Sequence, residues 1–245
     1  MLLKFDNPKL LADSISLINE LVLEVKAKIN KEGFEIIAID PANAAMVILK
    51  IPKSAFSQFD VEKEEELGLN LEDLKQVLRR ASSSSALIIE KKDNILHLKI
   101  QDAVKRNFTL SLIHIDAEEK NIPDLSFNSQ IEINSNTFSD VINDAAIVAD
   151  SCSFITNEAS FTIEARGTLN SARTEFSSDE VKIATNQESK SKYSLDYLMK
   201  FMKASKMSEK TTLRFSTNYP ARLDFKNPNG LMELSFILAP RFEEE

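Results

Sequence analysis

Two stretches of the chain repeat one pattern of apolar and basic residues, and this repeat constrains the fold more than any other feature. Residues 71–83 read LEDLKQVLRRASS and residues 195–210 read LDYLMKFMKASKMSEK. Apolar residues recur at helical spacing in both, which predicts two short amphipathic helices. Lys75 and Arg79 stand off the apolar arc of the first helix. The basic sector of the second helix contains Lys200, Lys203, Lys206 and Lys210. A solvated lysine face explains either helix alone, but the repetition favours a shared role.

Composition limits the classes of protein that the chain can belong to. Its 245 residues are enough for one large domain or two of about 120 residues. The net charge of −8 excludes a protein that coats nucleic acid with bulk positive charge, so any DNA contact needs a local basic surface. Cys152 is the single cysteine, which fits a reducing compartment. We expect a cytoplasmic protein, because no apolar run approaches the ~20 residues of a membrane span and the first residues lack the pattern of a signal peptide.

The order of predicted elements occurs twice along the chain. Each half reads as a strand, a helix, several strands, the basic helix and further strands, which indicates an internal duplication. Asn7 is the predicted N-cap of the first helix, and Ser135 or Asn136 that of the third. Residues 61–68 (VEKEEELG) read as a charged loop, and residues 108–115 alternate like a strand.

These patterns predict an α+β fold with antiparallel sheets and four helices on one face. The charged stretch before residue 128 contains a proline and lies near the midpoint of the chain, as expected of a linker. We therefore expect an N-terminal domain over residues 1–115, a connector over 116–128 and a C-terminal domain over 129–245.

Five stretches resemble the DNA sliding clamps of the proliferating cell nuclear antigen family in their archaeal form. They occur in the order and at the spacing of that family: 32–47 (EGFEIIAIDPANAAMV), 67–81 (LGLNLEDLKQVLRRA), 122–127 (IPDLSF), 217–225 (TNYPARLDF) and 238–245 (LAPRFEEE). The resemblance implies a processivity factor that encircles duplex DNA and serves in replication and repair. It implies two similar domains with sheets outside and the four helices on the inner face of a ring of three subunits.

The resemblance also implies how the ring closes and where it meets DNA. Strand 108–115 would pair with 171–178 of the neighbouring subunit, which would protect an exposed sheet edge. The implied interface residues are Phe108, Leu110, Leu112, His114, Ala172, Arg173, Thr174 and Phe176. The implied DNA-channel residues, which would contact phosphates without reading sequence, are Lys9, Lys75, Arg79, Arg80, Lys200, Lys203 and Lys206.

By the same resemblance, partner proteins dock through a short peptide whose apolar and aromatic anchors fill a pocket under the connector. The implied partners are the clamp loader, DNA polymerase, flap endonuclease and DNA ligase. The matching pocket residues are Ile39, Asn43, Ala44, Met46, Ile122, Pro123, Phe127, Tyr219, Pro220, Leu238, Ala239, Pro240, Arg241 and Phe242. The family often has an apolar residue where this chain has Lys120. Homotrimeric and mixed rings both occur in such clamps, and Lys120 together with a third helix that lacks Lys and Arg favours the mixed ring.

The sequence contains no recognisable set of catalytic residues, and we expect no catalysis, metal or cofactor. His97 and His114 lie on predicted strands and read as structural, and Cys152 has no sign of activation. The alternative within enzymes is a metal-dependent nuclease that uses Asp140, Asp144 and Asp150. Solvated aspartates explain these three more simply. A scaffold that never encircles DNA is the third class of function.

Overall fold

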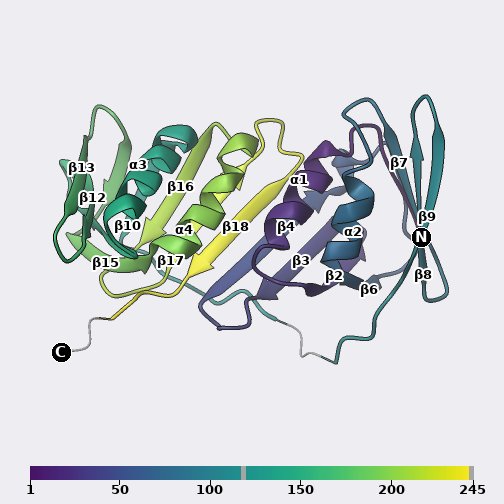
Figure 1. The fold of residues 1–245 in the computed structure, drawn as a ribbon, viewed down its shortest axis with the longest axis horizontal. Coiled ribbons are helices and arrows are strands. Elements are labelled where there is room, and N and C mark those ends of the chain that lie inside the picture. The colour runs from purple at the N-terminus through teal and green to yellow at the C-terminus, as the bar shows by residue number, and fades with distance from the viewer. Residues whose placement is uncertain (117–119, 243–245) are drawn as a thin grey trace. The chain divides into compact units, whose positions relative to one another are not determined.

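The chain divides into two compact units in the computed structural model, which describes residues 1–116 and 120–242 (Figure 1). Unit 1 comprises Met1–Pro41, Val47–Ile122 and Asn229–Leu234, and unit 2 comprises Ala42–Met46, Pro123–Pro228 and Ser235–Glu245. Both units contain two helices and mostly antiparallel sheets, which confirms the α+β class and the two similar halves. The boundaries at 115 and 128 stay a prediction. Residues 117–119 of the predicted connector and the terminal 243–245 lie outside the described residues.

Unit 1 builds two antiparallel sheets and a pair of contacting helices, α1 (Lys9–Ile18) and α2 (Leu71–Leu78). One sheet has the order β5-β1-β7-β8-β9, formed by Gln58–Asp60, Leu2–Phe5, Ala86–Lys92, Ile95–Gln101 and Lys105–Ser111. The other runs β6-β2-β3-β4, formed by Glu65–Asn70, Glu24–Asn30, Gly33–Ile39 and Ala45–Pro52. A 3₁₀ turn, η1 (Lys53–Ala55), follows β4.

Unit 2 repeats this plan with α3 (Ser135–Val148) and α4 (Leu195–Met202), which also contact each other. One sheet has the order β13-β12-β11-β15, formed by Ser171–Ser177, Ser160–Arg166, Ser151–Thr156 and Ser189–Ser194. The second runs β14-β10-β16-β17-β18, formed by Lys182–Thr185, Ser129–Asn134, Lys210–Phe215, Ala221–Lys226 and Glu233–Leu238. The 3₁₀ turn η2 (Lys203–Met207) continues α4.

The two basic helices form for the reasons that their sequences suggest. Asn70 caps α2, since its side-chain oxygen accepts a hydrogen bond from the backbone N–H of Asp73 at 3.1 Å. The buried positions of α2 and α4 are those of the predicted apolar arcs, which lie against their own units: Leu71, Leu74, Val77, Leu78, Leu195, Leu198, Phe201 and Met202. Burial of these side chains leaves the basic residues toward solvent.

Both basic helices are shorter than the sequence pattern indicated. α2 ends at Leu78, and α4 passes into η2 at Lys203. The placement of Lys210 on the second helix was wrong, because Lys210 begins β16 and pairs across the sheet with Asn134. Its ammonium lies 2.8 Å from Glu132, which accounts for the raised pKa of Lys210.

The predicted cap of the third helix was also wrong. Asn134 caps α3, as its side-chain oxygen accepts from the N–H groups of Asn136 and Thr137. The hydroxyl of Ser135 is buried instead and forms a hydrogen bond with the hydroxyl of Thr211. The expected cap at the first helix is wrong by one residue, since Pro8 is the N-cap of α1, although the Asn7 side chain accepts a hydrogen bond from the N–H of Lys9.

The prediction of a loop over residues 61–68, which rested on the charge of this stretch, was wrong from Glu65 onward. β6 begins at Glu65, and its leucines Leu67 and Leu69 are buried, while Glu66 is exposed and Glu65 is half-buried beside Lys91. Gly68 fits this strand because the carbonyl of Ile113 lies 1.9 Å from where a Cβ atom would stand. The strand predicted over residues 108–115 ends earlier in the structure. β9 stops at Ser111, and the backbone N–H of Ile113 donates to the carbonyl of Gly68 instead. The sequence analysis also did not predict β15, because its alternation of Ser and Lys contains no apolar residues that would mark the buried side of the strand.

Aromatic side chains fill the core of unit 2, and Phe154 lies at their centre. Its ring is fully buried, with centroid distances of 5.1 Å to Tyr193, 5.8 Å to Phe161 and 5.9 Å to both Phe138 and Phe215. Such ring pairs stabilise the core beyond the burial of their apolar area.

The substitution Phe154→Ala is expected to lower the free energy of unfolding by about 3–5 kcal/mol, because it removes this ring and leaves a cavity. Urea unfolding monitored by circular dichroism measures the loss. Ile147→Ala is the control, since Ile147 is 81% exposed on α3 and its truncation should change stability by no more than about 0.5 kcal/mol. Equal effects of the two substitutions would contradict this account of the core.

Candidate nucleic-acid interface

The basic residues of unit 1 gather at the C-terminal end of α2. Arg79 is the C-cap of the helix, and both Arg79 and Arg80 are exposed. Lys75 lies one turn earlier, largely covered, with its ammonium 3.0 Å from Glu72. Cations at a helix C-terminus are favoured by the helix dipole, so this placement also stabilises α2.

Unit 2 places its basic residues in the same way. Lys203 is the C-cap of α4, and Lys206 follows it in η2, both exposed. Lys200 lies one turn earlier, 2.9 Å from Asp196 and 5.3 Å from the centre of the Tyr197 ring. In both units, exposed cations thus lie at the end of the basic helix, and the lysine one turn earlier forms an ion pair with an acidic residue.

The sequence analysis did not identify the acidic residues that pair with these lysines. Glu72, Asp196 and Asp13 neutralise Lys75, Lys200 and Lys9 within their own helices. The i,i+3 and i,i+4 spacings in the sequence carried the signal. Hydrogen bonds from Lys75, then from Asn19 and Gln76, hold the pKa of Glu72 below its ordinary value. The positive surface is therefore concentrated at the helix ends, which suits weak phosphate contact rather than tight binding.

The third helix does not extend this basic surface. Asp140 and Asp144 are exposed on α3, and Asp150 follows the helix end. Asp150 binds elsewhere, with one carboxylate oxygen 2.9 Å from the Arg241 guanidinium. Within residues 1–116 and 120–242 no group of three or more His, Cys, Asp or Glu side chains could hold a metal ion. The arrangement gives the nuclease alternative no support.

The remaining candidates for chemistry are structural. His97 is half-buried on β8, and the exposed ring of His114 lies 2.8 Å from Asp116. Burial raises the pKa of the Cys152 thiol far above its ordinary value, so this cysteine is not an activated nucleophile. No helix in the described part of the chain is long and apolar enough to cross a membrane.

Both predicted interface strands lie at sheet edges. β9 ends the five-stranded sheet of unit 1, and β13 ends the four-stranded sheet of unit 2. Phe108 and Leu110 are half-buried on β9, as are Ala172 and Thr174 on β13, where Phe176 is buried. Arg173 lies 2.8 Å from Glu175 on its own strand. Leu112 and His114 lie beyond the end of β9, and Leu112 is buried.

The predicted pocket residues of unit 2 converge on the C-terminal tail. The N–H of Ala239 donates to the carbonyl of Ala44, and that of Arg241 donates to the carbonyl of Lys192. The ring of Phe127 meets that of Tyr219 edge-on at 6.0 Å. Five of the predicted residues are exposed: Asn43, Pro123, Ala239, Arg241 and Phe242. Half-buried positions are Ala44, Tyr219, Pro220 and Pro240, while Met46 and Leu238 are buried beneath them.

Asp150 holds this tail in place. Arg241 donates to one oxygen of its carboxylate at 2.9 Å, and the Ser151 hydroxyl donates to the other at 3.0 Å. These bonds, that of Arg241 first, hold the pKa of Asp150 below its ordinary value. Asp150 was predicted only as a rival metal ligand, since nothing in the sequence links it to Arg241.

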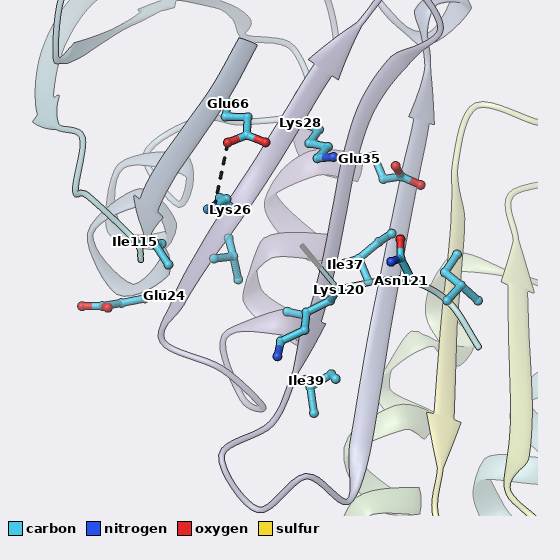
Figure 2. A pocket seen from close by; sticks show the side chains of 13 residues that line it. Glu24, Lys26, Lys28, Glu35, Ile37, Ile39, Glu66, Ile115, Lys120 and Asn121 are labelled. Atoms are coloured by element: carbon cyan, nitrogen blue, oxygen red, sulfur yellow. Dashed lines mark ion pairs between the residues drawn. The ribbon is translucent and has the colours of Figure 1, made fainter. Parts of the chain in front are cut away.

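The predicted pocket residues of unit 1, Ile39 and Ile122, line a groove of about 420 Å³ (Figure 2). Its apolar lining comes mainly from β3 and from residues 115 and 122. Lys120 and Asn121 lie beside it, and Lys26 on β2 pairs with Glu66 at 4.0 Å (Figure 2). The groove is thus apolar inside and charged at its rim, where Lys120 lies.

Comparisons with known proteins agree with this arrangement. Residues 1–121 match the family described as the N-terminal domain of proliferating cell nuclear antigen, and residues 121–241 match its C-terminal domain. The DNA polymerase sliding clamps of Thermococcus gammatolerans and Pyrococcus abyssi are 34% and 31% identical to this chain, over 98% of both sequences. The crystal structure of this antigen from Entamoeba histolytica shares the fold with a TM-score of 0.91 at 23% identity, over 98% of each chain.

These matches confirm the resemblance to archaeal clamps and extend it over nearly the whole chain. They also fit a subunit without catalytic groups, whose conserved architecture is a pair of similar domains. The chain therefore belongs to the proliferating cell nuclear antigen family, the non-catalytic DNA sliding clamps.

Proposed function

We propose that the chain encircles duplex DNA as one of three subunits of a ring and tethers clamp loader, polymerase, flap endonuclease and ligase in the cytoplasm. The observation that carries the proposal is the pair of exposed basic helix ends, one in each unit of an acidic protein. A ring retains DNA by topology, so its contacts with phosphate need only be weak and independent of sequence. The acidic remainder of the surface disfavours DNA outside the ring.

The channel is lined by the residues named from the family pattern. Arg79, Arg80, Lys203 and Lys206 contact phosphates directly. Lys9, Lys75 and Lys200 contribute less, because each is paired with an acid of its own helix. The exposed carboxylates Asp140 and Asp144 make the third helix a weakly repelling sector, which favours sliding over fixed binding.

The ring closes when β9 of one subunit pairs with β13 of the next. Each edge strand has seven residues, and both present half-buried apolar side chains beside polar ones. Pairing removes two long unpaired edges that would otherwise invite aggregation. A head-to-tail ring needs both edges on every subunit, so this arrangement fits three copies of this chain as well as the mixed ring that Lys120 and α3 favoured.

Partner peptides bind at the tail of unit 2 and along the groove of unit 1. The exposed ring of Phe242 and the half-buried Tyr219 and Pro220 offer apolar contacts to such a peptide. Lys120 gives the groove a positive rim that an acidic residue of the partner complements.

The double substitution Arg79→Gln and Arg80→Gln is expected to weaken binding to a short DNA duplex and to reduce its salt dependence. Each lost phosphate contact makes the slope of log K against log salt shallower by about 0.9, so a change of about 2 is expected. Fluorescence anisotropy over a salt series measures it. The control, Lys31→Gln with Lys53→Gln, removes the same charge from exposed sites off the helices. If both variants shift the slope equally, the helix ends are not the contact surface.

The homotrimer predicts a solution mass of three times the 27.6 kDa chain, about 83 kDa, by light scattering. Leu110→Asp should reduce this mass to that of one chain, because it places a charge in the apolar part of the β9 edge. Leu169→Asp is the matched control, since Leu169 is 93% exposed between β12 and β13 and should leave the trimer intact. A wild-type mass of one chain at every concentration would instead require different subunits to complete the ring.

Asp150→Asn is expected to weaken binding of a labelled peptide with apolar and aromatic anchors by about 2- to 5-fold. The substitution removes the charge that holds Arg241, and exposed ion pairs contribute up to about 1 kcal/mol. Asp144→Asn makes the same chemical change on the exposed face of α3 and should leave peptide affinity unchanged. Unaltered affinity in Asp150→Asn would separate the tail contact from partner binding.

A further inference from the structure

One arginine connects the edge strand β9 to the end of the basic helix α2. The Nη1 group of Arg106, on β9, donates to the backbone carbonyl of Arg80 at 2.9 Å. Its Nη2 group donates to the carboxylate of Asp102, in the turn between β8 and β9. A single guanidinium thus bridges the strand assigned to the subunit interface and the loop that carries two DNA-channel arginines.

Asp102 fixes the orientation of this bridge. Its carboxylate accepts hydrogen bonds from the backbone N–H of Val104 at 3.0 Å and from the hydroxyl of Ser85 at 2.9 Å. These bonds, that of Val104 first, together with the Arg106 charge hold the pKa of Asp102 below its ordinary value. Ser85 also binds the N–H of Ser82, so the loop after α2 is tied to the same carboxylate.

The bridge binds a backbone carbonyl just beyond the end of α2. Arg80 follows the C-cap Arg79, so its carbonyl lies in the loop that leaves the helix rather than within the helix. Arg106 supplies a donor to this carbonyl from another element rather than from the helix itself. Its Nε atom is buried and has no partner among the described residues, an energetic cost that a smaller side chain on β9 would avoid.

We propose that Arg106 is a positioning residue that holds Arg80, and Arg79 beside it, at a fixed place relative to the edge strand β9. Closure of the ring at β9 and phosphate contact at the end of α2 then depend on one another. Pairing of β9 with the next subunit orders the strand, the strand orders Arg106, and Arg106 orders the loop that meets DNA. This inference rests on the proposed ring and channel, and it goes beyond them by coupling the two surfaces.

Arg106→Lys tests the bridge with the positive charge retained. A lysine ammonium can still pair with Asp102, but it lacks the planar fork that reaches two acceptors in fixed geometry. The expected result is an unchanged ring mass with about 3- to 10-fold weaker binding to a short duplex at 0.1 M salt. The salt slope should become shallower by about 0.9, the value for one phosphate contact. Asp102→Asn, which frees the guanidinium from the other side, should change DNA binding in the same direction.

A double-mutant cycle separates positioning from a structural role. If Arg106 acts through Arg79 and Arg80, then Arg106→Lys combined with Arg79→Gln and Arg80→Gln should bind DNA no more weakly than Arg79→Gln with Arg80→Gln alone. Additive losses would overturn the proposal, as would wild-type DNA binding by Arg106→Lys when Arg80→Gln is impaired. Lys105→Gln is the control, because it removes an exposed charge from the adjacent position of β9 and should leave the slope unchanged.

The same cycle distinguishes failure of the bridge from failure of the proposed function. An Arg80→Gln variant with the wild-type salt slope contradicts the phosphate contact itself, and the positioning role fails with it. A reduced slope for Arg80→Gln beside a wild-type slope for Arg106→Lys leaves the channel in place and removes only the bridge. Loss of the trimer in Arg106→Lys would assign the residue to ring closure rather than to coupling.

Discussion

Burial of the apolar face of each basic helix determines where the charges of this protein lie. Leu71, Leu74 and Leu78 in α2 are almost fully buried, and each contributes about 1.5–3 kcal/mol of transfer free energy. That burial fixes the rotation of the helix about its axis, so the residues on its opposite side must face away from the core. Leu195, Leu198 and Phe201 do the same for α4, where Phe201 stacks on Phe236 at 4.3 Å. The positive surfaces are therefore a consequence of packing.

Acids of the same helices limit the strength of these surfaces. Glu72 and Asp196 lie near the helix N-termini, where the helix dipole favours negative charge, and they pair with the lysines one turn later. Exposed cations lie at the C-terminal ends, where the dipole favours them. One distribution of charge thus stabilises the helices and, in the proposed ring, limits DNA contact to a few side chains. A sliding clamp needs such modest contact, because each additional phosphate contact steepens the salt dependence and slows release.

The two sheet edges raise a different physical problem, that of unpaired backbone groups. β9 and β13 are long edges, and the proposed ring closure would pair both of them. Arg106 connects β9 to the end of α2 through the backbone carbonyl of Arg80, just beyond the helix. Asp150 has a comparable part in unit 2, where it ties the tail residue Arg241 to the start of β11. In both units a charged side chain thus ties together two segments that are distant in the sequence.

The sequence by itself determined the class of fold, the duplication, the buried faces of α2 and α4 and the family, because these depend on local periodicity and on motifs in order. It misjudged features that depend on distant partners. Lys210 joined β16 since strand pairing with β10 outweighs helical spacing, and Glu65 joined β6 since β2 lies beside it. Only tertiary structure decided that Asp150 holds Arg241 and that Arg106 reaches Arg80. Those pairs lie 91 and 26 residues apart, and hydrogen bonds between such positions leave no period in the sequence.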